Sequence, residues 1–200
     1  MKQALIIIDY TENACIELYQ NPRFNLRLSK VREIEPSLEK LAAFHRTLNE
    51  GEIIWIKSRP WVKGQLHPNI ERFNDDNPEV EFYSIKLGGN NFYRIQPGEH
   101  EKVFEKNMYS AFTGTQGRLD AYLREKNIGH LIINGIYSTG CVNATICEAF
   151  HLGYKLTIIS DCVETFDDPG KQSFQQHLLN DWSLMYGKVI DLPHYLEKAK

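Results

Sequence analysis

The sequence predicts a three-layer α/β/α sandwich built on an open, mostly parallel, Rossmann-like sheet of about six strands. Two observations predict this fold. Short apolar runs alternate with longer, helix-like segments along the chain, and strands that alternate with helices form parallel sheets with right-handed crossovers. The chain also has 200 residues, of which 42% are hydrophobic, and this is enough for one domain with a substantial core. We therefore expect residues 1–200 to form a single domain.

The strands are expected at the apolar runs. The run "ALIII" (4–8) is continuously apolar, which is typical of a parallel strand that is buried on both faces. Five later runs are expected to form the other strands: "EIIWIK" (52–57), "KVFEK" (102–106), "HLIIN" (130–134), "KLTIISDCV" (155–163) and "KVID" (188–191). The last of these is expected to lie at an edge of the sheet.

Helices are expected between these strands. Glycine often follows the end of a helix, as Gly153 does after the fourth strand and its helix. The expected helices span residues 28–50, 114–127, 141–152 and 170–186. The segment 59–101 contains four prolines and no regular pattern. We expect it to be irregular, and a connection of this length usually contributes to function.

Composition and charge argue against several classes of function. The net charge is −3 and no basic stripe occurs, so we expect no nucleic-acid partner. No run approaches the ~20 apolar residues of a membrane span, and the apolar start of the chain ends at Asp9 without a signal-peptide cleavage site. We therefore expect a cytoplasmic protein with no membrane partner, in which the four cysteines are reduced.

Three reactive side chains stand at the C-terminal ends of predicted strands. Asp9 follows the first strand, Lys106 ends the third, and Cys141 lies just after the fourth. Because ligands of open parallel sheets bind outside this edge, we expect the three residues to converge there. Cys141 would be a nucleophile at a helix N-terminus, Lys106 would lower the pKa of its thiol, and Asp9 would move its proton. Backbone N–H groups around residues 137–141 could form an oxyanion hole.

Each of these residues also has a purely structural explanation. A cysteine in an apolar helix is often a core residue, an aspartate after a strand is often a helix cap, and a lysine at a strand end is often solvated. Their expected convergence favours the functional explanation. We further expect Gly140 to let the chain turn sharply beside Cys141, and Gly135 to release the preceding strand.

Three separated segments resemble the isochorismatase-like cysteine hydrolases, a family that includes nicotinamidases, N-carbamoylsarcosine amidase and ureidoacrylate amidohydrolases. The segments are "ALIIIDYTEN", "VFEKNMYSAFTGT" and "NGIYSTGCVNATICEAFHLGYKLTIISDC". The resemblance implies a catalytic triad of Asp9, Lys106 and Cys141. It also implies a cis peptide bond between Ile136 and Tyr137, with the N–H groups of Tyr137 and Cys141 as the oxyanion hole, and a homodimer or homotetramer.

The segment after the second strand departs from the metal-binding motif of nicotinamidases. The chain has "IKSRPWVKGQLHP" there, with Ser58 and Pro60 where an aspartate and a histidine would be expected. His67 then remains as a loop histidine. We therefore predict no catalytic metal, and no other cofactor is implied. Ala14 stands where the family commonly has a pocket phenylalanine, which suggests a reshaped pocket.

The retained aspartate, lysine and cysteine favour hydrolysis of a C–N bond. The Cys141 thiolate would attack the carbonyl of a small amide or ureido substrate, Asp9 would protonate the leaving amine, and water would hydrolyse the thioester. Contacts to this small-molecule substrate are expected from Arg59, Trp61, Tyr109, Tyr137 and Ala14, although simple packing or surface exposure also explains these side chains. Two alternatives stay open: an isochorismatase-type hydrolase of a vinyl ether, which does not need the cysteine, and a catalytically silent member that binds a small molecule.

Overall fold

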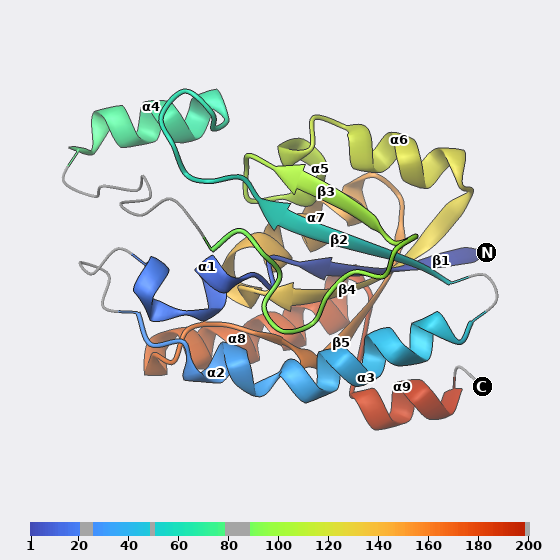
Figure 1. Cartoon of the computed structure of the whole chain (residues 1–200). Helices are drawn as coiled ribbons and strands as arrows, with labels where there is room; N and C mark the ends of the chain where they lie inside the picture. The colour runs from blue at the N-terminus through green and yellow to red at the C-terminus, as the bar shows by residue number, and fades with distance from the viewer. Residues whose placement is uncertain (21–25, 49–50, 79–88, 199–200) are drawn as a thin grey trace.

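A computed structural model describes residues 1–20, 26–48, 51–78 and 89–198. Within them, six strands form one sheet in the order β3-β2-β1-β4-β5-β6, and every neighbouring pair is parallel (Figure 1). The strands are β1 (Lys2–Ile8), β2 (Glu52–Ser58), β3 (Lys102–Lys106), β4 (Ile128–Ile136), β5 (Lys155–Glu164) and β6 (Lys188–Ile190). The predicted fold class is therefore confirmed.

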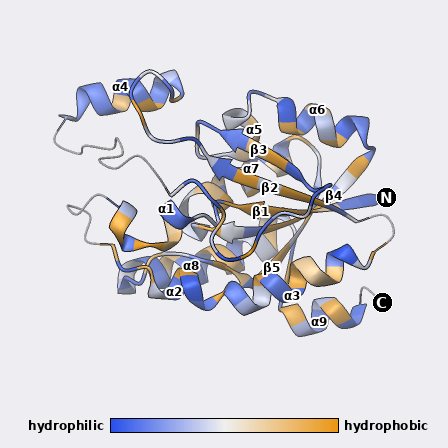
Figure 2. Cartoon of the chain, in the orientation of Figure 1, coloured by the Kyte–Doolittle hydropathy of each residue, from blue (hydrophilic) through white to orange (hydrophobic). Residues whose placement is uncertain are grey.

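The central strand β1 is apolar because both of its faces are covered. Its residues Ala4–Ile8 are almost completely shielded from solvent, and β2 and β4 pair with its two edges. Successive side chains of a strand point to opposite faces, so Ile6 and Ile8 enter one core while Leu5 and Ile7 enter the other. Figure 2 shows the hydrophobic colouring concentrated in the strands and the polar colouring on outer helices such as α6.

Helices cover both faces of the sheet and complete the three layers. Side chains of one group of helices pack with Ile6 and Ile8: α5 (Ala111–Gly114), α6 (Arg118–Glu125), α7 (Asn143–His151) and α8 (Pro169–Asp181). Side chains of a second group pack with Leu5 and Ile7: α1 (Glu12–Cys15), α2 (Ser29–Glu33), α3 (Glu35–Arg46) and α9 (Leu192–Lys198). No helix of the described chain is long and apolar enough to cross a membrane.

Several helices differ from those expected. The predicted helix 28–50 is divided at Ile34 into α2 and α3, and Pro36 in the first turn of α3 marks the new start, since proline is tolerated there. Residues 49–50 of that prediction lie outside the described chain. The segment expected to be irregular contains α4 (Pro68–Asp76), which stands apart from the sheet in Figure 1. The predicted helix 114–127 is observed as α6, and helices α1, α5 and α9 were not predicted.

Candidate active site

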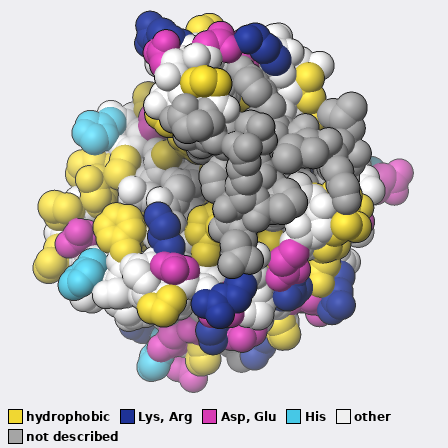
Figure 3. All heavy atoms as spheres, turned by 90° about the vertical axis from the view of Figure 1, so that its left-hand side faces the viewer, with side chains coloured by type: hydrophobic (Ala, Val, Ile, Leu, Met, Phe, Trp, Pro, Cys, Tyr) yellow, Lys and Arg dark blue, Asp and Glu magenta, His cyan; other side chains and the backbone are white. Residues whose placement is uncertain are grey.

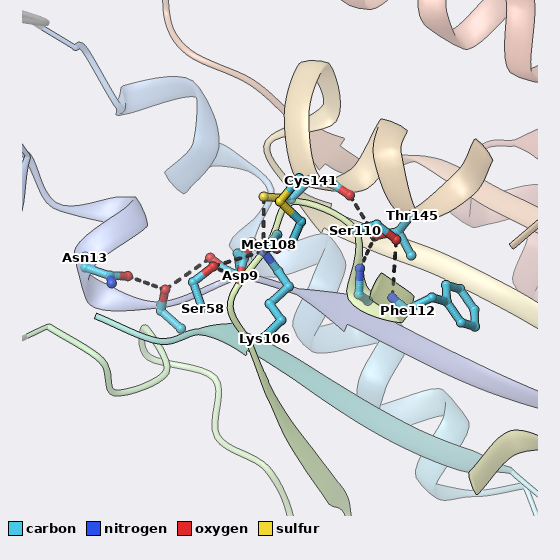
Figure 4. Close-up of polar contacts among 11 residues, drawn as sticks. Asp9, Asn13, Ser58, Lys106, Met108, Ser110, Phe112, Cys141 and Thr145 are labelled. Atoms are coloured by element: carbon cyan, nitrogen blue, oxygen red, sulfur yellow. Dashed lines mark hydrogen bonds and ion pairs between the residues drawn. The ribbon is translucent and has the colours of Figure 1, made fainter. Parts of the chain in front are cut away.

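The register of the sheet places the predicted reactive residues at one edge. Ile8 of β1 pairs with Ile56 of β2, so Asp9 follows directly beside the end of β2. Ser58, the last residue of β2, pairs with Lys106, the last residue of β3. Because all strands run in the same direction, their C-terminal ends bring these polar side chains together, as Figure 4 shows.

The Lys106 ammonium group is the centre of this cluster. Its Nζ lies 2.8 Å from Asp9 Oδ2 and donates to Cys141 Sγ at 3.2 Å. It also donates to Ser58 Oγ at 2.9 Å and to the Met108 carbonyl at 3.2 Å (Figure 4). Lys106 is 1% exposed and Asp9 is 5% exposed, so the ion pair is removed from bulk water. The structure thus brings Asp9, Lys106 and Cys141 into one group, in which the ion pair is buried and Cys141 is partly exposed.

Ser58 connects the two charged residues, although in the sequence it stands out only as a position where a metal ligand is missing. Lysine can only donate and an ionised carboxylate can only accept, so the Ser58 hydroxyl accepts from Lys106 and donates to Asp9 Oδ1 at 3.1 Å. Asp9 itself has a φ of +53°, a left-handed conformation that aspartate tolerates better than most residues. In the sequence, Ser58 is marked only by its position at the end of a predicted strand, and its contacts with Asp9 and Lys106 depend on the register of the sheet.

Cys141 lies in a wide helical turn, Ser138–Val142, that leads into α7. The predicted helix 141–152 therefore begins two residues later than expected. The Val142 N–H donates to the Tyr137 carbonyl across this turn. Thr145 fixes the far side, because its hydroxyl donates to the Cys141 carbonyl at 2.7 Å and accepts from the Ala111 N–H at 3.0 Å. The segment after Lys106 and the segment with Cys141 are thereby held together.

The two glycines near Cys141 have different roles. Gly135 has a φ of +114°, and a Cβ atom there would lie 2.2 Å from the Ile8 carbonyl oxygen, so the close approach of β4 to β1 requires glycine. Gly140 has no such requirement: nothing lies within 4 Å of a Cβ at its position. The expectation that Gly140 is needed for a sharp turn is therefore not supported, whereas Gly135 does mark an irregular point, where the β4–β5 register shifts.

The peptide bond between Ile136 and Tyr137 is cis. The Tyr137 hydroxyl donates to the Ala14 carbonyl at 2.6 Å, and its ring packs on Phe166 with centroids 4.1 Å apart. Tyr137 therefore links the Cys141 segment to α1, which follows Asp9. Its contact with Ala14 is made to the Ala14 backbone carbonyl, and a substrate contact by either residue stays a prediction.

Burial dominates the electrostatics of the Cys141 thiol. It raises the pKa of Cys141 to about 12, and the Asp9 charge and its hydrogen bond to the thiol act in the same direction, while Lys106 acts against them. Lys106 lowers the pKa of the thiol as expected, but burial and Asp9 together act more strongly in the opposite direction. The Asp9 and Cys141 charges, in turn, outweigh burial and raise the pKa of Lys106 well above its usual range. The resting cluster is a neutral thiol beside an ion pair.

The other residues expected to contact a substrate lie around this edge of the sheet. Tyr109 is 37% exposed and packs on Trp61 with ring centroids 5.8 Å apart, and Cys141 and Lys106 both influence its pKa, which burial raises. Arg59 instead lies beside Glu105, with Nε 4.0 Å from Oε2. Figure 3 looks onto this edge, where hydrophobic and charged side chains both reach the surface.

The predicted loop histidine has a structural role. His67 is the N-cap of α4, where its Nδ1 accepts from the Asn69 N–H at 3.2 Å. Among the residues that the structure describes, no group of three or more His, Cys, Asp or Glu side chains is placed to hold a metal ion. Ser58, at the position expected for a metal ligand, is engaged by Asp9 and Lys106 instead.

Comparison with known proteins identifies the family. Residues 3–193 match the family model that describes the isochorismatase domain. The chain belongs to the isochorismatase family. It is a hydrolase of this family. The chain is 29% identical over 184 residues to the uncharacterized isochorismatase family protein PncA of Bacillus subtilis (strain 168), and the match covers 90% of this chain and 96% of that protein. It is 26% identical over 212 residues to the ureidoacrylate amidohydrolase RutB of Cronobacter sakazakii, and this match covers 98% of this chain and 88% of that protein.

Solved isochorismatase-family structures share the fold. A cysteine hydrolase from Pseudomonas syringae pv. phaseolicola 1448A superposes with a TM-score of 0.79 at 19% identity, covering 98% of this chain and 92% of that one. The nicotinamidase PncA from Bacillus subtilis superposes with a TM-score of 0.72 at 24% identity, and the superposition covers 96% of this chain and 100% of that one. At these identities the likeness concerns the fold, and the chemistry has to be argued from the residues of this chain.

Proposed function

We propose that this isochorismatase-family protein is a cysteine-dependent amidohydrolase that cleaves a C–N bond of a small amide or ureido compound. One observation carries the proposal: the Lys106 ammonium contacts both the Asp9 carboxylate and the Cys141 sulfur at the C-terminal edge of the sheet. A nucleophile, a proton carrier and a fixed positive charge are the groups that covalent acyl transfer needs. The amidohydrolase RutB among the relatives gives independent support.

The first half of the reaction forms a thioester. Because the resting thiol is neutral, substrate binding has to be followed by transfer of the Cys141 proton to Asp9 as sulfur attacks the carbonyl carbon. The new C–S bond pushes the carbonyl electrons onto oxygen, where the N–H groups of Tyr137 and Cys141 would stabilise the charge. Collapse of this intermediate breaks the C–N bond, and Asp9 returns its proton to the leaving nitrogen.

The second half of the reaction releases the acid. Asp9 takes a proton from a water molecule as its oxygen attacks the thioester carbonyl. The C–S bond then breaks, the electron pair returns to sulfur, and the proton on Asp9 restores the thiol. Lys106 remains protonated throughout, because its pKa lies well above the usual range, and it balances the negative charge that moves between Asp9 and Cys141.

Trapping of the thioester tests this proposal. A panel of small primary amides and ureido acids is screened for ammonia release, and the active compound is then mixed with enzyme and quenched with acid for intact-protein mass spectrometry. We expect an acyl adduct on Cys141 and a loss of turnover of at least about 10³-fold in Cys141→Ala. Hydrolysis of isochorismate that persists in Cys141→Ala would instead favour the vinyl-ether alternative, and ligand binding without any turnover would favour the silent one.

A further inference from the structure

The Ser58 hydroxyl, like the Cys141 thiol, contacts both members of the buried ion pair. It accepts one hydrogen from Lys106 and donates its single hydrogen to Asp9 Oδ1. Asp9 Oδ2 is meanwhile occupied by Lys106 at 2.8 Å. Both oxygens of the carboxylate therefore have a donor before any substrate arrives.

Ser58 and the Cys141 sulfur compete for the hydrogens of the Lys106 ammonium group. The ammonium group has three hydrogens and four acceptors within reach: Asp9, Ser58, the Met108 carbonyl and Cys141. Three hydrogens cannot serve four acceptors singly, so at least two of these contacts share a hydrogen, and Ser58 and the Cys141 sulfur are among the acceptors that compete. Loss of the Ser58 hydroxyl would leave three acceptors for three hydrogens and would release one hydrogen to Cys141.

The second contact of Ser58 acts on Asp9 in the same sense. A hydroxyl that donates to a carboxylate stabilises its ionised form more than its protonated form. In the resting cluster, the proton shared by Cys141 and Asp9 is therefore kept on sulfur. When Asp9 has to give a proton to a leaving nitrogen, the same hydrogen bond favours its return to the carboxylate form.

We propose that Ser58 is a positioning residue that keeps the proton on Cys141 in the resting protein and makes Asp9 a better proton donor to the leaving group. The second part of this role rests on the proposed amidohydrolase function, whereas the first part concerns the free protein alone. The role predicts an unusual combination: without the hydroxyl, the thiol becomes more reactive while turnover becomes slower.

The test measures both quantities in Ser58→Ala. Alkylation of Cys141 by iodoacetamide at pH 7 is followed by peptide mass spectrometry, and kcat and KM are measured with the amide found by the ammonia screen. We expect alkylation to be at least about threefold faster and kcat at least about tenfold lower, with KM within about twofold. Ser58→Thr keeps a hydroxyl and should restore both rates toward the wild-type values.

Ser160→Ala is the matched control, because Ser160 is a half-buried serine on β5 that donates to a carboxylate, Asp161, away from the cluster. It should change neither rate. Slower alkylation together with slower turnover in a folded Ser58→Ala protein would reduce Ser58 to a packing role and overturn the proposal, as would unchanged rates. The alkylation result needs no substrate, so it tests the role of Ser58 even if the proposed function is wrong. A failure of the proposed function would appear separately, as a missing acyl adduct on wild-type Cys141.

Discussion

The Lys106 ammonium lies 2.8 Å from the Asp9 carboxylate, and both side chains are almost completely shielded from solvent. An ion pair in this position stabilises the fold only while both partners are present, because removal of one leaves a buried charge without compensation. The pair that we assign to catalysis is therefore also a structural element of the sheet edge.

Removal of one partner of this pair should be more harmful than removal of both. We expect Lys106→Met to lower the free energy of unfolding by about 3–5 kcal/mol, and Lys106→Met combined with Asp9→Asn to recover a large part of that loss. Urea unfolding followed by circular dichroism measures both values. Equal stability of the single and double variants would show that the charges do not interact in the folded protein.

Burial of Cys141 should be visible in the pH dependence of its alkylation. The pKa of its thiol is raised to about 12, so the thiolate is a minor species at neutral pH and its fraction grows about tenfold per pH unit. We expect the alkylation rate of the free protein to rise without a plateau from pH 6 to pH 10, with circular dichroism as the check that the fold persists. A plateau below pH 8 would mean that Lys106 outweighs burial.

Gly135 and Gly140 form a matched pair for a test of the chain path beside Cys141. A Cβ at Gly135 would lie 2.2 Å from the Ile8 carbonyl oxygen, whereas a Cβ at Gly140 would meet nothing within 4 Å. We expect Gly135→Ala to cost several kcal/mol, more than about 3, because β1 and β4 would have to separate. Gly140→Ala should leave stability within about 1 kcal/mol. Thermal unfolding of the two variants distinguishes them, and a stable Gly135→Ala protein would contradict the β1–β4 geometry.

His45 should make the protein less stable in acid. It is fully buried on α3, its Nε2 lies 2.9 Å from the Tyr195 hydroxyl of α9, and burial lowers its pKa from 6.5 to about 4. The unfolded chain binds this proton below pH 6.5 and the folded chain does not. The contribution of His45 to the free energy of unfolding is therefore fully present above about pH 6.5. It is lost as the pH drops toward 4, by at most about 3 kcal/mol.

The variant His45→Gln tests this assignment. It removes the titrating group, so its stability should fall less between pH 6.5 and pH 4 than that of the wild-type protein, as measured by urea unfolding at a series of pH values. His130, whose pKa is also lowered to about 4 by burial and by nearby positive charges, remains in both proteins and accounts for part of the decline that persists. Parallel curves for the two proteins would assign the acid sensitivity elsewhere.

The sequence predicts the sheet and the reactive residues at its C-terminal edge better than it predicts the detailed contacts of the site. The apolar run 4–8 predicts β1 because a strand covered on both faces has no place for polar residues, and Asp9 and Lys106 stand out because polarity begins where these strands end. Helix α4 was missed because its proline and its many polar residues resemble a loop, although Pro68 is an allowed first helical residue.

Other features depend on contacts between distant segments. The raised pKa of Cys141 follows from how densely the surrounding chain packs around it, and the bridging role of Ser58 follows from its pairing with Lys106 across two strands. A short hydroxyl side chain has no periodicity or spacing of its own that would reveal either contact. Such details require the register of the sheet, which the sequence pattern does not specify.

The strand order also has a consequence for synthesis of the protein in the cell. The most apolar strand, β1, emerges from the ribosome first, yet one of its two edges pairs with β4, as in Ile8 with Gly135, more than a hundred residues later. At ribosomal speeds of ~5–20 residues per second, this edge waits on the order of 10 s for its partner. An unpaired apolar strand is prone to aggregation during that interval, so we expect chaperones that shield nascent chains to determine how much of this protein reaches its native state.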